Sequence, residues 1–191
     1  MKAPQPMIQN TGGVTGMKFA TRAVVAALAL AGLVLTLGCS YQSVHHLKRQ
    51  TWAPNSPRTL TMNYLTFTYT CGQRETSLSV QGRAFPRKDT IPGWAGWIDD
   101  IWLGAYLSDN NGRVLAKSLQ ILPPQTLNPE EGLAFEFSLK PHDMGSPGPV
   151  FVSFGYRLVL TAREPKKTME VPGKNEDERV FFASESALTR F

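Results

Sequence analysis

The chain has 191 residues, enough for one domain with tails, and its 42% hydrophobic and 10% aromatic content excludes a wholly disordered protein. Its net charge of +5 is mostly an N-terminal property: beyond Lys2, Lys18 and Arg22, 17 Lys and Arg residues stand against 15 Asp and Glu residues. The resulting charge of +2, without a cluster of bases, argues against a nucleic-acid partner.

The N-terminal region has the layout of an export signal. From Met17 the chain carries two bases, Lys18 and Arg22, followed by residues 23–37, all of them apolar, Gly or Thr. This run of about 15 residues is short for a membrane-spanning helix, which needs roughly 20. Residues 1–38 are therefore predicted to be a secretory signal peptide. The residues before Met17 are either an extended N-terminal region of the signal or untranslated, and we favour a start at Met17.

The apolar run ends in Leu-Thr-Leu-Gly-Cys at residues 35–39, after which the chain turns polar. This stretch resembles the lipobox of bacterial lipoproteins, in which a small residue precedes an invariant cysteine. The resemblance implies cleavage between Gly38 and Cys39 and attachment of a diacylglycerol to the Cys39 thiol. Thr36 and Leu37 depart mildly from the family pattern. Two or more acyl chains attach a protein stably to a bilayer, whereas one chain binds only marginally.

The alternatives for this segment are an uncleaved signal anchor and a soluble export signal that contains a cysteine. In Gram-negative lipoproteins an Asp after the cysteine often causes retention in the inner membrane. Ser40 therefore implies the outer membrane, facing the periplasm, if the host is diderm. The resemblance thus predicts a cell-envelope protein held in a membrane by the lipid on Cys39. A lipidated Cys39 could not pair with Cys71, which would leave the folded domain a single free thiol.

Residues 39–59 show no sustained strand or helix periodicity and contain Pro54 and Pro57. They are predicted to be a lipidated N-terminus followed by a tether or an irregular lead-in to the fold. The adjacent His45 and His46 have no Cys or acidic residue at ligand spacing, so we interpret them as solvated tether residues. The sequence indicates neither a metal site nor a cofactor.

Residues 60–163 show the alternation that is typical of β-strands, without a convincing amphipathic helix. The predicted strands span residues 60–70, 76–85, 97–109, 113–122, 133–139 and 150–162. The turn sequence Asp-Asn-Asn-Gly at 109–112 predicts a hairpin, because Asn and Gly tolerate positive φ. Short strands with turns between them predict an all-β fold, an immunoglobulin-like antiparallel β-sandwich of about seven strands.

Residues 77–162 also resemble the immunoglobulin-like FxLYD domains of exported bacterial proteins. The resemblance is carried by the stretches SVQGRAFPR at 79–87, AYLSDNNGRVLA at 105–116 and TLNPEEGLAFEF at 126–137. The sequence departs from the family pattern in the order of Tyr106 and Leu107, at Ser108, and at Glu130 and Glu131. The resemblance implies the sandwich architecture, and it implies no shared active site.

Residues 164–191 are charged, contain Pro and Gly, and are predicted to be an exposed linker and a C-terminal tail. Within this segment, residues 180–183 form either a final strand or part of a frayed tail.

No combination of residues predicts catalysis, so the protein is not expected to be an enzyme. Asp99 and Asp100 are adjacent and would point to opposite faces of a strand, which excludes a carboxylate pair. His142 is the one histidine of the predicted domain, and no nucleophile motif, phosphate loop or dinucleotide fingerprint occurs. Cys71 is interpreted as a semi-buried thiol at a strand end, with a reactive thiol as the alternative.

Trp94, Trp97, Trp102 and Tyr106 form the most distinctive cluster. Trp97 and Trp102 are predicted on opposite faces of one strand, so at least one of them lies away from the core. Exposed aromatic rings form sugar platforms or protein-binding hot spots, whereas immunoglobulin-like sandwiches routinely bury a Trp. We interpret the cluster mainly as core packing and expect Trp94, exposed on a loop, to be the first candidate for binding.

The sequence therefore predicts a lipid-anchored envelope protein whose non-catalytic sandwich binds another envelope protein or supports an assembly. A module that binds cell-envelope polysaccharide through the tryptophans is the alternative. Clustered exposed tryptophans would favour the glycan, and a flat apolar patch would favour a protein partner. A pocket with convergent titratable groups would favour an enzyme.

Overall fold

A computed structural model describes residues 40–74, 77–141, 148–165 and 179–190, so the predicted signal peptide and Cys39 lie outside it. The regular secondary structure of these residues consists of strands. Among them there is no helix long and apolar enough to cross a membrane. In chain order the strands are β1 (Tyr41–Ser43), β2 (Gln50–Thr51), β3 (Arg58–Thr61), β4 (Leu65–Arg74), β5 (Ser77–Pro86), β6 (Trp97–Ser108), β7 (Val114–Leu122), β8 (Gln125–Thr126), β9 (Leu133–Leu139), β10 (Phe151–Thr161), β11 (Val180–Glu185) and β12 (Leu188–Arg190).

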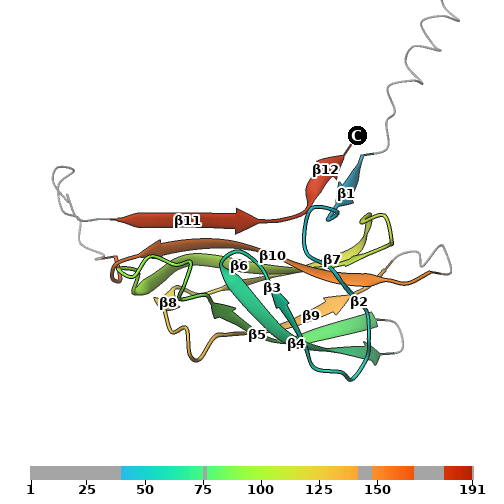
Figure 1. Cartoon of the computed structure of the whole chain (residues 1–191), viewed down its shortest axis with the longest axis horizontal. Helices are drawn as coiled ribbons and strands as arrows, with labels where there is room; N and C mark the ends of the chain where they lie inside the picture. The colour runs from blue at the N-terminus through green and yellow to red at the C-terminus, as the bar shows by residue number, and fades with distance from the viewer. Residues whose placement is uncertain (1–39, 75–76, 142–147, 166–178, 191) are drawn as a thin grey trace, which may run out of the picture. The chain divides into compact units, whose positions relative to one another are not determined.

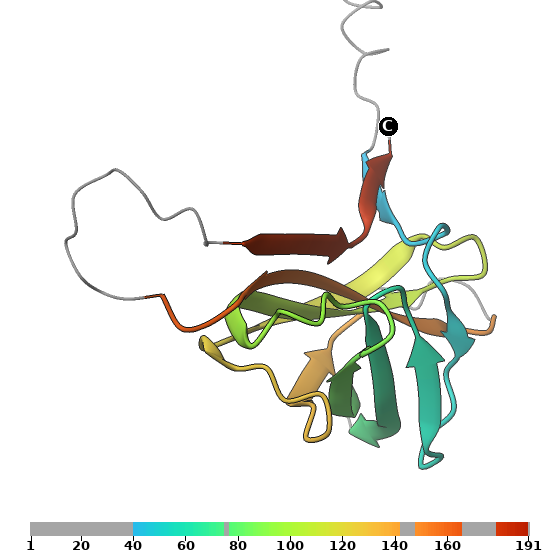
Figure 2. The ribbon, with the colours of Figure 1, turned by 60° about the vertical axis from the view of Figure 1, so that its left-hand side comes forward.

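The strands form two facing sheets and a two-stranded ribbon, β1–β12 (Figures 1 and 2). The four-stranded sheet has the order β3-β4-β5-β9. The six-stranded sheet has the order β11-β10-β6-β7, with β2 beside β10 and β8 beside β6. The orders β4-β5-β9 and β11-β10-β6-β7 correspond to strands A-B-E and G-F-C-C′ of an immunoglobulin-like sandwich. The predicted antiparallel β-sandwich with about seven principal strands is confirmed.

The core lies between the two sheets, where alternate residues of each strand point inward. In β9 the alternation is complete, with four buried apolar residues separated by exposed ones. Phe67 of the four-stranded sheet stacks on Phe154 of the six-stranded sheet, with ring centroids 4.2 Å apart and an interplanar angle of 3°. Phe135 lies 5.6 Å from the same Phe154 ring. Such aromatic pairs add about 0.5–1.5 kcal/mol each beyond the burial of their area.

The β6–β7 hairpin forms at the predicted turn. Gly112 has a φ of 79°, the conformation for which glycine is suited. The Asp109 side chain accepts a hydrogen bond from the Arg113 N–H at 2.9 Å, and the Gly112 N–H donates to the Asp109 carbonyl at 3.1 Å. The hairpin prediction is therefore confirmed.

Residues 40–59, predicted to be a tether or an irregular lead-in to the fold, pack on the sandwich as a lead-in does. Val44 and Leu47 are buried, and the Val44 N–H donates to the Gly112 carbonyl at 2.8 Å. The segment has too few apolar residues to show a period, so its packing depends on contacts with strands distant in sequence.

Side-chain hydrogen bonds of Gln50 in β2 connect the same segment to the four-stranded sheet. The Tyr69 hydroxyl donates to Gln50 Oε1 at 2.9 Å, and Gln50 Nε2 donates to the Thr59 carbonyl at 2.7 Å. Burial, followed by the nearby Cys71 thiol, raises the pKa of Tyr69 to about 12, so this hydroxyl stays protonated and remains a donor. The N-terminal segment is thus part of the domain.

The single strand predicted over residues 60–70 is two strands, β3 and β4, joined by a tight turn. The Met62 N–H donates to the Leu65 carbonyl at 2.9 Å across this turn. The alternation continues through both strands, so the pattern alone does not mark the exposed Asn63 as a turn residue.

The C-terminal segment contributes a strand to the six-stranded sheet. β11 pairs with β10 over six residue pairs, from Thr161 with Val180 to Tyr156 with Glu185, and Ala183 is buried. The final strand, one of the two predicted alternatives, is therefore present and extends to Glu185.

Candidate functional site

A β-bulge in β6 determines which of the predicted aromatic residues share a face. In the pairing with β10, Leu160 lies opposite Ile98 and Val159 lies opposite Asp100, so Asp99 is the extra residue. An extra residue reverses the alternation of side chains on the two sides of a bulge.

The reversal places both Ile98 and Ile101 in the core, where neither side chain is exposed. Trp97 and Trp102 consequently point to the same side, the outer face of the six-stranded sheet, and both are half-buried. The prediction that they occupy opposite faces is wrong, because it assumed a strand without a bulge.

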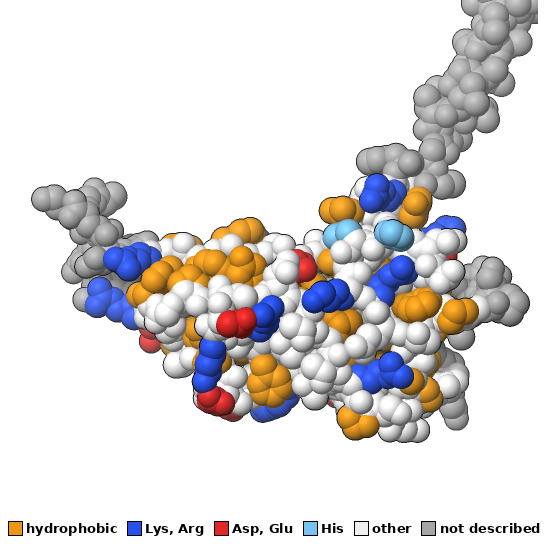
Figure 3. Space-filling view, in the orientation of Figure 1, with side chains coloured by type: hydrophobic (Ala, Val, Ile, Leu, Met, Phe, Trp, Pro, Cys, Tyr) orange, Lys and Arg blue, Asp and Glu red, His pale blue; other side chains and the backbone are white. Residues whose placement is uncertain are grey.

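The outer face of the six-stranded sheet exposes large apolar side chains. Ile121 and Leu119 of β7 are 72% and 59% exposed, and Val180 and Phe182 of β11 are 59% and 60% exposed. Figure 3 shows hydrophobic side chains along β11 and the elements next to it. We name this surface the outer apolar face and define it by its alternating register as Trp97, Trp102, Leu119, Ile121, Val159, Val180 and Phe182.

Several of these residues are cross-strand neighbours. Trp102 lies opposite Ile121, and Val159 lies opposite Phe182. Between them, Arg157 Nε lies 3.1 Å from Asp100 Oδ2, and its guanidinium lies over the Phe182 ring. The ion pair is about half exposed, so it is worth at most about 1 kcal/mol, and its two charges cancel.

The outer face of the four-stranded sheet is polar by comparison. Its alternating residues include Thr66, Thr68, Gln81, Glu136 and Ser138. A shallow groove of about 610 Å³ lies on this side, lined in part by Gln81, Arg83, Gln120 and Glu136. Its titratable lining residues are one carboxylate, Glu136, and one guanidinium, Arg83.

Tyr106 is buried at one end of the outer face of the six-stranded sheet. Its ring lies against Gly155, where an added Cβ would be 2.9 Å from Tyr106 Cε2 and 2.8 Å from the Glu185 carbonyl oxygen. Burial raises the pKa of Tyr106, and a hydrogen bond with the Ala187 backbone opposes this rise. Gly104, the cross-strand neighbour of Gly155, gives the ring further room. Tyr106 therefore packs and is not available as a binding residue.

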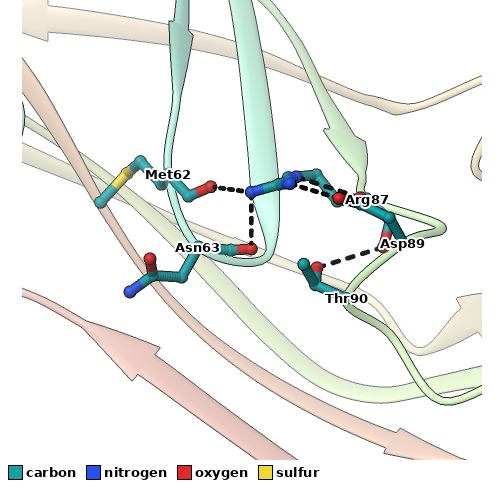
Figure 4. Close-up of polar contacts among 5 residues, drawn as sticks. All are labelled: Met62, Asn63, Arg87, Asp89 and Thr90. Carbon is teal, nitrogen blue, oxygen red and sulfur yellow. Dashed lines mark hydrogen bonds and ion pairs between the residues drawn. The ribbon is translucent and has the colours of Figure 1, made fainter.

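Trp94 lies on the loop between β5 and β6 and is half-buried rather than exposed. Arg87 holds the start of this loop (Figure 4). Arg87 Nη1 donates to the carbonyls of Met62 and Asn63 at 3.1 and 3.2 Å. The same guanidinium pairs with Asp89, and its hydrogen bond lowers the pKa of that carboxyl. The loop is thus tied to the β3–β4 turn.

The structure therefore brings together only part of the predicted aromatic cluster. Trp97 and Trp102 share the outer apolar face, Tyr106 is buried at its end, and Trp94 lies on a separate loop. No ring contact joins any two of the four among the described aromatic pairs. The most exposed apolar residues of this face, on β7 and β11, were not predicted as site residues.

The described part of the chain holds no group of three His, Cys, Asp or Glu side chains able to bind a metal ion. His45 and His46 are exposed, with His46 Nε2 2.9 Å from the Ser186 carbonyl oxygen, and His142 lies outside the described residues. Cys71 is buried, and burial raises the pKa of its thiol. A buried, protonated thiol is a poor nucleophile.

Comparison with models of protein families, with curated proteins and with solved structures gives no match. The lipobox and the FxLYD resemblance accordingly stay predictions.

The glycine under Tyr106 can be tested by mutation. We expect Gly155→Ala to lower the free energy of unfolding by about 1–3 kcal/mol, because the added methyl overlaps the Tyr106 ring and a backbone carbonyl. Gly93→Ala is the matched control, since an added Cβ there meets nothing within 4 Å. Urea unfolding of both variants measures the difference, and equal stabilities would contradict the packing of Tyr106 on Gly155.

Proposed function

We propose that this protein is a lipid-anchored, non-catalytic protein of the cell envelope whose outer apolar face binds a partner protein. The observation that carries the proposal is the exposure of four large apolar side chains, Leu119, Ile121, Val180 and Phe182, by 59–72% on one side of a sheet. They lie on β7 and β11, with Trp102 of β6 between them, and apolar side chains grouped on one face mark interaction sites.

The composition of the face favours a protein partner over a polysaccharide. Its most exposed members are Leu, Ile, Val and Phe, which bury apolar area against a protein surface. A sugar platform needs exposed indole or phenol rings, yet Trp97 and Trp102 are half-buried. Polysaccharide binding is the second candidate, favoured by the placement of these two rings on one face.

The proposed anchor lies very close to the domain. Cys39 directly precedes Ser40, and β1 begins at Tyr41. Two residues span at most about 7 Å, so a lipid on Cys39 would hold the β1–β12 ribbon next to the bilayer. The sandwich would then sit at the membrane surface and not on a tether.

Basic side chains near β1 support this orientation. Arg190 lies opposite Tyr41 in the ribbon, and the Arg113 guanidinium lies 5.8 Å from the Tyr41 ring centroid. Arg49 donates from Nη1 to the carbonyl of Asp109 in the adjacent hairpin turn. Figure 3 shows Lys, Arg and His side chains gathered at this end. Each base near an anionic bilayer is worth about 1 kcal/mol of attraction.

Anchoring supplies the mechanism. A partner held in the same envelope meets the outer apolar face at a high effective concentration, so a weak contact becomes an effectively intramolecular one. Outer-membrane attachment facing the periplasm follows if the host is diderm.

The anchor is tested by Cys39→Ser. We expect this variant to lose all acyl labelling and to leave the membrane fraction, because the oxygen of serine is not a substrate for thioether lipidation. Cys71→Ser is the control and should keep both properties. Unlabelled Cys39→Ser protein that stays in the membrane would show an uncleaved signal anchor.

The binding face is tested by Ile121→Lys, which places a charge on the outer apolar face without altering the core. We expect capture of the partner by chemical crosslinking in intact envelopes to fall at least tenfold, which is about 1.4 kcal/mol. Thr68→Lys, at an exposed position of the other sheet, is the matched control and should capture normally. Loss of polysaccharide binding in Trp97→Ala, with normal protein capture by Ile121→Lys, would favour the second candidate instead.

A further inference from the structure

β11 is an open edge of the six-stranded sheet. Within the described residues its one paired strand is β10, and in both ribbon views the β1–β12 ribbon stands beyond its C-terminal end and not alongside it (Figures 1 and 2). An edge strand presents a row of unpaired backbone N–H and C=O groups that can pair with another strand.

Apart from the charge of Glu185 at its end, this edge lacks the features that usually prevent pairing. β11 reads Val-Phe-Phe-Ala-Ser-Glu, without Pro, Gly or Lys, and pairs regularly with β10 over its whole length. The opposite edge strand, β7, carries the exposed Lys117 and a bulge at Leu115, and β3 has only four residues. Native proteins protect edges with charges, bulges and short strands. β11 is therefore the edge best suited to accept a strand.

The sequence of β11 and its preceding residue is complementary to itself in the antiparallel direction. When two copies are centred on Phe182, Arg179 of each copy lies opposite Glu185 of the other. Val180 then faces Ser184, and Phe181 faces Ala183. Residues directly opposite each other in antiparallel strands are about 4.5–5.5 Å apart, and opposite charges in such pairs are favourable.

The side chains have the positions that this pairing requires. Arg179 is exposed, and Glu185 is held at the end of the strand, where its Oε1 accepts hydrogen bonds from the Tyr156 hydroxyl and the Asn63 N–H. Residues 179 and 185 are separated by an even number, so both point to one side of the sheet, while Phe182 points to the other. Phe182 is 60% exposed and would pack on its counterpart.

We propose that a second copy of this chain pairs with β11 in antiparallel register about a two-fold axis at Phe182. The contact is isologous, so it closes at a dimer. It joins two six-stranded sheets edge to edge and places their outer apolar faces side by side. This inference stands on β11 alone and does not depend on lipidation or on the partner protein proposed above.

A second copy is favoured over an unrelated strand by the charges. Any extended peptide could satisfy the backbone of β11, but two ion pairs form only with a strand that carries a base and an acid six residues apart in this order, as a second copy does.

Thiol crosslinking tests the register directly. In the full chain carrying Cys39→Ser, Phe182→Cys should form a disulfide-linked dimer under mild oxidation, because the two thiols meet at the two-fold axis. Ile121→Cys, at a similarly exposed position on the opposite edge, is the matched control and should stay monomeric. Equal dimer yields from both positions, or a disulfide from Phe182→Cys to a different protein, would overturn the proposal.

Analytical ultracentrifugation of the Arg179→Glu variant tests the proposed ion pairs. Arg179 lies just before β11, so this substitution leaves the strand itself unchanged. Two Glu–Glu contacts replace two ion pairs, so we expect the dissociation constant of the dimer to rise at least tenfold, and 1 M salt should recover part of this loss by screening. Arg179→Gln should show a smaller rise. A monomeric parent protein at crosslinking concentrations, or a dimer unaffected by Arg179→Glu, would overturn the proposal.

Discussion

Each sheet of this sandwich can bury only one face in the shared core, and the rest of the molecule follows from that constraint. The inner faces meet at the Phe67–Phe154 stack. The outer faces are left to solvent or to a partner, and they differ in chemistry. The four-stranded sheet presents threonines and other polar residues, whereas the six-stranded sheet presents exposed Leu119, Ile121 and Phe182. Folding alone does not require apolar residues there, and their exposure is the basis of the proposed binding face.

Much of the fold could be predicted because its signals are local. The alternation of β9 and the Asp-Asn-Asn-Gly turn depend on neighbouring residues, and both were found in the structure. The bulge at Asp99 could not be predicted, since one extra residue leaves the composition of β6 unchanged and only its pairing with β10 reveals it. The packing of Val44 likewise depends on contacts distant in sequence.

The candidate site was predicted in part for the same reason. Trp97 and Trp102 stand out by residue type, but their common face depends on the bulge in β6. Leu119 and Ile121 were not predicted as site residues. Which side of β7 faces the core depends on the register of β7 with β6, and this register shifts next to the hairpin turn. An ordered segment from Ser40 also changes the proposed attachment, which becomes close contact with the membrane.

We propose that the outer apolar face, and not the polar face of the other sheet, is occupied by a partner in the envelope. Site-specific photocrosslinking measures this directly, with a photoreactive amino acid placed at Leu119 in one protein and at Thr68 in another. The account predicts an adduct of defined mass from Leu119 and none from Thr68. An adduct from Thr68 alone, or equal adducts from both positions, would contradict it.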